Sequence, residues 1–286
     1  MNLYNDDTLK FSYDGEQYLL HIREDSDPLN PRKDCDNAAI MACFHPRYNL
    51  GDDISAVGDE ELWISLVAEC FTDEELIKRA ESGAIRSIRL SPCDDPDMVS
   101  LSVCYKWATV LGDSDSVWGE MKVDKRYLAH EIRESLSIKA CQALLKGKVE
   151  WLPLYLYDHS GITMSTSPFC DPWDSGMVGW IYCTKEHAVD DIGWNEDTWA
   201  EQAIKAMEEE VKVYDQYLTG DVYGFTLLRL VDGEWEEENS CWGFFGSDIE
   251  TNGITDYVCG LEEAIKSGEY EYGEAKLVTM SFYKYS

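Results

Sequence analysis

The sequence predicts an α+β fold: a mixed, mainly antiparallel sheet with two long helices and several short ones. Segments with strand-like alternation cluster along the chain, and helical segments interrupt them without strict β-α-β alternation. Asp14-Gly15, between two alternating segments, is a strong hairpin signal. Helical periodicity is longest over 126–146 and 196–218. We expect one domain over residues 1–286, with a subdivision near 123–149 as the alternative.

The first part of the chain contains both strand and helix signals. We predict strands over 9–11, 17–22, 38–44, 85–90, 99–107 and 117–121. Residues 23–37 predict a loop because they are rich in Pro, Asp and Asn. A helix is expected over 59–70, with acids at its start. Thr72 and Glu75 have the spacing of a capping box for a second helix, which Gly83 would end.

The part of the chain after residue 149 contains further strand signals and the second long helix. We predict strands over 150–157, 177–183, 222–231, 234–239 and 275–285, and a short helix over 261–266 that ends near Gly268. Asn195 or Asp197 can cap the helix over 196–218, and Gly220 follows its end. Its apolar stripe is Trp199, Ala203, Met207, Val211, Tyr214 and Leu218. The glycine–aromatic run 240–246 predicts a bulge or close packing.

Acidic residues dominate the charge of the chain. It carries 56 Asp and Glu against 24 Lys and Arg, a formal net charge of −32. A field of this sign repels nucleic acids and membrane surfaces and attracts basic partners. We therefore expect no direct binding of nucleic acid. Three explanations stay open: an acidic surface without a specific role, a binder of divalent cations, and a mimic of the nucleic-acid backbone.

Cysteine usage and hydropathy indicate the compartment. The ten cysteines sit singly and include no CxxC pair, so we interpret them as reduced structural thiols and expect no cofactor. A zinc site assembled from distant Cys and His stays open as an alternative, although no spacing supports one. No segment approaches the ~20 apolar residues of a membrane helix. Residues 1–7 do not resemble a signal peptide. We expect a cytoplasmic protein without a membrane partner; the oligomeric state stays open.

The stretch 155–182 is the one around which we expect the chain to be organised. It begins and ends as a strand, and between these strands it collects hydroxyls, glycines, prolines, acids and a histidine. Loops of this length inside a compact domain are usually functional or disordered. The aromatic content argues against disorder. We predict a structured loop that shapes a surface or a pocket.

Several motifs carry a resemblance over roughly residues 15–250. They are Asp27-Pro28-Leu29-Asn30-Pro31-Arg32, Asp36-Asn37, His45-Pro46-Arg47-Tyr48-Asn49-Leu50-Gly51-Asp52, Asp158-His159-Ser160-Gly161-Ile162, Trp173-Asp174-Ser175-Gly176 with Gly179, Tyr214-Asp215-Gln216-Tyr217-Leu218-Thr219-Gly220 and Ser240-Cys241-Trp242-Gly243-Phe244. Together they resemble a family of proteins encoded by phages and mobile elements. The resemblance implies no activity. It implies a context, because accessory proteins of phages and plasmids often act against bacterial defence systems.

The same motifs supply groups that could form an active site. His45, Asp52, His159 and Asp174 offer acid–base groups and carboxylates for a metal. The sequence lacks G-x-S-x-G, HExxH, a P-loop and a dinucleotide fingerprint. Asp and Ser in loops most often bond their own backbone and fix turns. Catalytic, metal-binding and structural interpretations of these residues therefore stay open.

We expect a binding surface built from the motifs and from the acidic face of the helix over 196–218. Its candidate residues are Arg32, Asn37, Tyr48, Asn49, Asp52, His159, Ser160, Trp173, Asp174, Ser175, Trp242, Glu201, Glu208 and Glu209. Glu210 is expected on the same solvated helix face. Tyr48, Trp173 and Trp242 would form the walls of one concave polar centre.

The leading functional hypothesis is an inhibitor of a bacterial defence protein, such as a nuclease or a CRISPR effector, acting in the host cytoplasm. Its carboxylates would take the place of phosphates on a basic, nucleic-acid-handling cleft. The alternative is a metal-dependent hydrolase or nucleotide-processing enzyme centred on His45, Asp52, His159 and Asp174. A structural phage protein is the third hypothesis.

Overall fold

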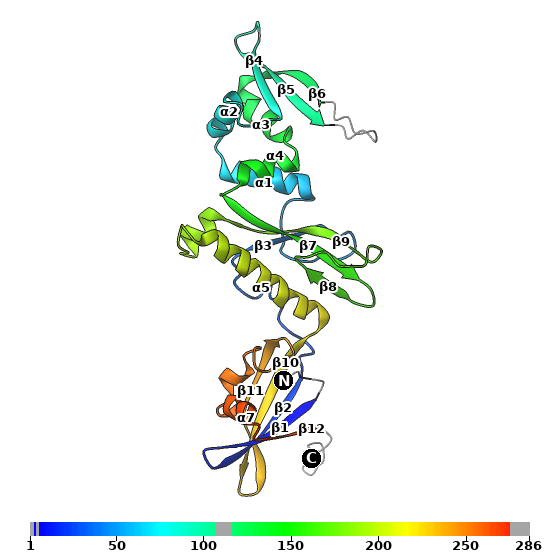
Figure 1. Ribbon diagram of the computed structural model, residues 1–286, viewed down its shortest axis with the longest axis vertical. Helices are drawn as coiled ribbons and strands as arrows, with labels where there is room; N and C mark the ends of the chain where they lie inside the picture. Colours follow the sequence, from blue (N-terminus) through cyan, green and yellow to red (C-terminus); the bar gives the residue numbers. More distant parts are fainter. Residues whose placement is uncertain (1–2, 4–5, 107–115, 275–286) are drawn as a thin grey trace. The chain divides into compact units, whose positions relative to one another are not determined.

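The described part of the chain forms a mainly antiparallel α+β fold with three sheets, which confirms the predicted fold class (Figure 1). The computed structural model describes residues 3, 6–106 and 116–274. The chain divides into two compact units. The first comprises Met1–Asn37, Pro153–Val178 and Ala206–Ser286, and the second Ala38–Leu152 and Gly179–Lys205.

The first unit contains a five-stranded sheet with the order β11-β10-β2-β1-β12, in which every neighbouring pair is antiparallel. Its strands are β1 (Asp7–Tyr13), β2 (Glu16–Glu24), β10 (Val222–Val231), β11 (Glu234–Phe245) and β12 (Tyr270–Glu274). The predicted hairpin is confirmed: Asp14 and Gly15 both have a positive φ, as a two-residue turn between antiparallel strands requires. The predicted strand over 275–285 lies outside the described residues.

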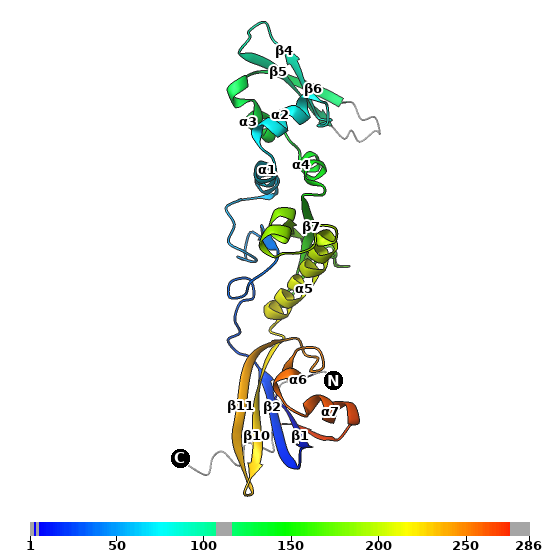
Figure 2. The ribbon, with the colours of Figure 1, turned by 90° about the vertical axis from the view of Figure 1, so that its left-hand side faces the viewer.

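Two short helices, α6 (Ile254–Tyr257) and α7 (Leu261–Ser267), cover one face of this sheet (Figure 2). Alternate strand residues such as Leu9, Leu20 and Phe225 point into the core beneath them and are fully buried. The glycine–aromatic run forms the expected bulge. Its register shifts by one residue between Tyr223/Phe244 and Gly224/Trp242, because Gly243 is the extra residue of β11.

The second unit has a three-stranded sheet and most of the helices. Its elements are α1 (Asp59–Cys70), α2 (Asp73–Glu81), β4 (Ile88–Pro92), β5 (Met98–Lys106), β6 (Ser116–Asp124), a 3-10 turn (Lys125–Tyr127), α3 (Leu128–Glu134), α4 (Ile138–Leu145) and a π-helical turn (His187–Asp191). The capping box at Thr72 and Glu75 is present as predicted. At the centre of the core, Trp63 meets Trp151 and Trp180 edge-to-face, with ring centroids 5.0 and 5.2 Å apart.

The prediction of one long helix over 126–146 was wrong. α3 ends at Glu134 and α4 begins at Ile138. Two serines divide them. The Ser135 hydroxyl donates to the Glu131 carbonyl, and the Ser137 hydroxyl accepts from the Ala140 amide as the N-cap of α4. Serine side chains compete with helical backbone hydrogen bonds in this way, so the helix breaks at these residues. The apolar periodicity of the sequence nevertheless continues through the break.

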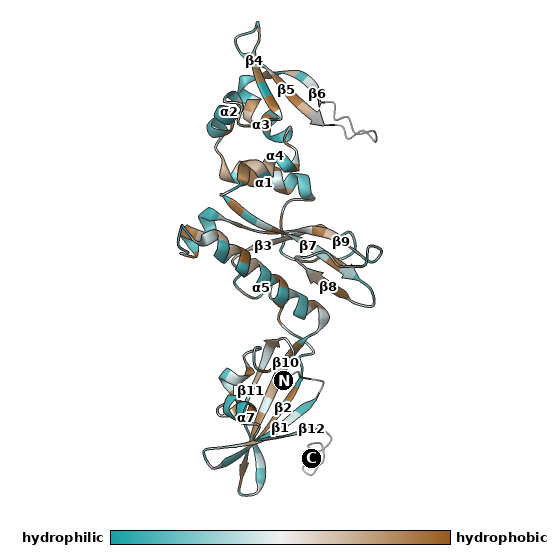
Figure 3. Ribbon diagram, viewed as in Figure 1, coloured by the Kyte–Doolittle hydropathy of each residue, from teal (hydrophilic) through white to brown (hydrophobic). Residues whose placement is uncertain are grey.

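A third sheet has the order β3-β9-β7-β8: β3 (Ile40–Cys43), β7 (Val149–Asp158), β8 (Ile162–Ser165) and β9 (Ser175–Thr184). The long helix α5 (Trp199–Thr219) is confirmed, and Figure 3 shows hydrophobic and hydrophilic residues alternating along it. Most of the predicted stripe is buried, namely Trp199, Ala203, Met207, Val211 and Tyr214. The remaining member, Leu218, is half-buried.

Candidate functional site

The central stretch is structured, and it contains a strand that the sequence did not reveal. β8 pairs antiparallel with the end of β7, from Tyr155 opposite Ser165 to Asp158 opposite Ile162. The turn between them places Ser160 at a positive φ of 59°. Helix α5 fixes β8, because the Asp215 carboxylate accepts from the Met164 amide at 2.7 Å. Burial raises the pKa of Asp215, as expected for a carboxylate held below the surface.

His159 and Asp174 meet at the outer end of this hairpin. His159 Nδ1 lies 3.0 Å from Asp174 Oδ2, and the Asp158 amide donates to the Asp174 carbonyl at 2.8 Å. The His159 ring stacks on Tyr157, which also contacts Phe169. Both members of the pair are exposed, so solvent or a partner can reach them. Two motifs that the sequence separates therefore form one surface feature.

Trp173 is the most exposed large apolar side chain of this feature, at 91%. Its backbone is nevertheless fixed. Asp171 Oδ1 accepts from the amides of Trp173 and Asp174, at 2.8 and 3.3 Å, and the Ser175 hydroxyl donates to the Asp171 carbonyl. Asp171 was not among the predicted site residues, although an Asp before Pro172 is a turn signal. The turn presents a solvent-exposed indole on an ordered backbone.

The residues after β3 form a separate group within the second unit. His45 Nδ1 accepts from the amides of Arg47 and Tyr48 at 3.3 Å, and its ring stacks on Tyr48 with centroids 4.9 Å apart. The Asp52 carboxylate accepts from the Met41 amide at 2.7 Å. These bonds shape the local turn and continue the hydrogen bonding at the edge of β3. Asn49 is exposed beside them.

Arg32 and Asn37 hold the loop after β2 in place within the first unit. Arg32 is buried, and its guanidinium donates to Glu210 of α5 at 2.7 Å. The prediction that Glu210 lies on a solvated helix face was therefore wrong: its side chain is only 14% exposed because it pairs with Arg32. Asn37 donates to the carbonyls of Pro31 and Cys35. Both predicted binding residues thus stabilise the fold.

The other expected surface residues are accessible. Trp242 is 44% exposed, and the Arg23 guanidinium lies over its ring at 5.2 Å. Glu201, Glu208 and Glu209 are exposed on α5. The structure places Trp173 and Trp242 in the first unit and Tyr48 in the second, so the predicted common centre of three aromatic walls stays a prediction.

The described residues include no group of three or more His, Cys, Asp or Glu side chains placed to hold a metal ion. Over that same part of the chain, no helix combines the length and the apolar character needed to cross a bilayer. No protein family, curated protein or solved structure matches the chain. The feature around Trp173, His159 and Asp174 is the candidate site, because it combines an exposed indole with an exposed imidazole–carboxylate pair.

Proposed function

We propose that the protein is a phage-type inhibitor that binds a basic, nucleic-acid-handling surface of a bacterial defence protein in the host cytoplasm. The observation that carries the proposal is Trp173, an indole with 91% exposure on a backbone fixed by Asp171. Leaving such a side chain in water is unfavourable, and aromatic side chains dominate the energetic centres of protein interfaces. A fixed backbone lowers the entropy lost on binding.

Exposed carboxylates of the first unit support a basic partner. Asp174 is exposed next to Trp173, and Glu208 and Glu209 are exposed on α5 within the same unit. The whole chain has 56 acids against 24 Lys and Arg, so more than half of its carboxylates have no Lys or Arg of their own to pair with. Arg and Lys side chains that bind phosphates also bind carboxylates, often through two hydrogen bonds. The acidic surface would compete with nucleic acid for such a cleft.

The experiment is affinity capture from a bacterial lysate at low and at moderate salt, with identification by mass spectrometry. We expect one nucleic-acid-handling defence protein, held at low salt and released at moderate salt. Trp173→Ala should weaken binding of the purified partner about 30-fold, corresponding to ~2 kcal/mol for an aromatic anchor. Tyr127→Ala is the matched control, because Tyr127 is also an exposed aromatic, at 59%.

Three results would count against the proposal. Capture that is insensitive to salt would indicate a mainly apolar interface rather than mimicry of phosphates. An unchanged affinity of Trp173→Ala would remove the anchor from the argument. A partner without any nucleic-acid-handling surface would contradict the proposed target.

The hydrogen-bonded pair of His159 and Asp174 favours a second candidate, a metal-dependent hydrolase or nucleotide-processing enzyme. An imidazole oriented by a carboxylate is a common arrangement for a metal ligand or a general base. Calorimetric titration with Zn²⁺ and Mn²⁺ tests this candidate. Saturable binding that His159→Ala abolishes would support it, and no heat of binding would leave it without support.

A further inference from the structure

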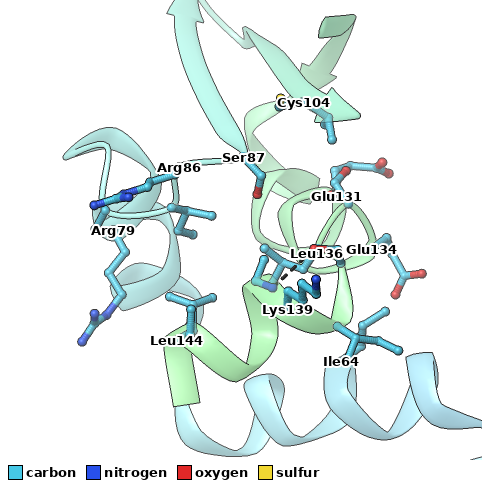
Figure 4. A pocket seen from close by; sticks show the side chains of 18 of the residues that line it. Ile64, Arg79, Arg86, Ser87, Cys104, Glu131, Glu134, Leu136, Lys139 and Leu144 are labelled. Carbon is cyan, nitrogen blue, oxygen red and sulfur yellow. Dashed lines mark hydrogen bonds between the residues drawn. The ribbon is translucent and has the colours of Figure 1, made fainter. Parts of the chain in front are cut away.

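A cavity in the second unit and a strand edge in the first unit both lie outside the surface around Trp173. The cavity has a volume of about 1520 Å³ (Figure 4). Three cationic and three acidic residues line it, namely Arg79, Arg86, Lys139, Glu60, Glu131 and Glu134. Because these charges balance, the cavity favours neither an anionic nor a cationic ligand. The strand edge is more selective.

This edge belongs to β11, the last strand on one side of the five-stranded sheet (Figure 2). With 12 residues, β11 is the longest strand that the structure describes. Over the described ranges, no segment other than β10 pairs with it. In an antiparallel pair, alternate N–H and C=O groups of a strand point away from its neighbour. The outer row of such groups on β11 is a template for an additional strand.

The stretch Glu234–Glu237 is a regular part of this edge. It pairs with β10 without a register shift. The turn before it is a tight two-residue turn, because Asp232 and Gly233 both have a positive φ. A strand that pairs here would therefore meet a main chain that β10 already holds in an extended conformation, which lowers the entropy lost on binding.

The same stretch carries unpaired carboxylates. Glu234, Glu236 and Glu237 are exposed, and neighbouring side chains of a strand point to opposite faces of the sheet. Among the residues that the structure describes, no Lys or Arg lies within 4.0 Å of these three carboxylates. The next residue, Glu238, pairs with Arg229 at 3.1 Å. Lys or Arg side chains of an added strand would form cross-strand pairs of opposite charge, which stabilise a sheet.

These carboxylates also exclude other strands. If β11 paired with β11 of a second copy, glutamates would approach glutamates, and like charges on neighbouring strands are destabilising. An acidic strand of another protein would meet the same repulsion. Charged side chains are a common protection of sheet edges against self-association. Here they repel copies of the chain and attract a basic strand, so they select between partners.

We propose that the edge of β11 at Glu234–Glu237 binds an extended, basic segment of a partner protein as an additional strand. Main-chain hydrogen bonds would supply affinity, and Lys or Arg side chains opposite the glutamates would supply specificity. The proposal goes beyond the inhibitor function. It requires neither the surface around Trp173 nor a defence protein, so failure of one proposal leaves the other standing.

The test uses the full chain and a short synthetic peptide of alternating Lys and Thr with capped ends. Calorimetric titration should show saturable binding. Hydrogen exchange of the outward amides of β11 should slow about tenfold when the peptide is bound. The control peptide has the same sequence, with two neighbouring residues N-methylated. It keeps its charge and loses a donor on each edge, so it should bind about tenfold more weakly.

Two variants distinguish the edge from general attraction to an acidic protein. Glu237→Lys should weaken binding of the Lys-Thr peptide about fivefold, because it replaces an attraction at the edge with a repulsion. Glu263→Lys makes the same charge change at an exposed position of α7 in the same unit, and should weaken binding by about twofold or less. Equal binding of the N-methylated peptide, equal effects of the two variants, or unchanged exchange of the β11 amides would overturn the proposal.

Discussion

Replacing Arg32 with Met should destabilise the first unit far more than removing an exposed ion pair. Arg32 Nη1 lies 2.7 Å from Glu210 Oε2, and their side chains are only 1% and 14% exposed. Arg32→Met keeps much of the aliphatic stem and removes the charge. The carboxylate of Glu210 then remains largely buried beside an apolar side chain, which is the costly outcome for a buried pair.

The magnitude follows from burial. Breaking a buried ion pair by removing one partner costs about 3–5 kcal/mol. Water reaches Glu210 in part, so we expect the lower end, about 3 kcal/mol. Replacing both residues, as in Arg32→Met with Glu210→Met, leaves no unpaired charge and should cost less than Arg32→Met alone. Exposed pairs contribute about 0–1 kcal/mol.

The assay is urea unfolding followed by tryptophan fluorescence, with each unit allowed its own transition. A loss of 3 kcal/mol should lower the midpoint of the affected transition by roughly 1–2 M. Lys266→Met is the control, because Lys266 pairs with Glu262 in the same unit with both side chains mostly exposed. If Arg32→Met costs no more than this control, the ion pair does not anchor the loop and the reasoning fails.

Three further predictions concern packing, thiols and pH. Gly224→Ala should destabilise the first unit by about 1–3 kcal/mol and shift the emission of Trp242, because the new methyl would lie 2.0 Å from its ring. An unfolding curve and emission like those of the wild type would contradict this. Burial raises the pKa of Cys141 to about 12, so iodoacetamide at pH 8 should alkylate it far more slowly than the exposed Cys170. The alkylation rate of Cys141 should rise with pH. Comparable rates for the two thiols, measured by mass spectrometry, would contradict this. Burial lowers the pKa of His21 below 6.5, so the unfolded state binds more protons just below that pH, and stability should rise with pH through this window. His21→Gln should reduce the dependence of stability on pH, measured as the urea midpoint between pH 5 and 7. An unchanged dependence would show that other groups cause it.

Local signals predicted the elements that local bonds determine. The hairpin at Asp14-Gly15 and the helix capped by Thr72 were predictable because a few adjacent residues fix their geometry. The break between α3 and α4 at Ser135 also depends on adjacent residues, but the continuous hydrophobic periodicity of the segment led to the prediction of one helix. β8 was missed because its four residues owe their strand conformation to pairing with β7 and to Asp215, which lies 51 residues away.

The candidate site was predictable only in part. The sequence indicated that the stretch around His159 and Trp173 was structured, and the two motifs do meet there. Nothing in the sequence paired Arg32 with Glu210 across 178 residues, and a sequence motif alone does not distinguish a buried structural arginine from an exposed one.

The proposed inhibitor would use its charge and its indole at different stages of binding. Long-range attraction between an acidic surface and a basic cleft acts before contact, so it raises the association rate and weakens with salt. Burial of Trp173 occurs only after contact, so it lengthens the lifetime of the complex. The net charge of −32 belongs to the whole chain, whereas the exposed indole belongs to one turn. Charge alone would attract many basic proteins, and discrimination between them would therefore depend on the turn that Asp171 holds in place.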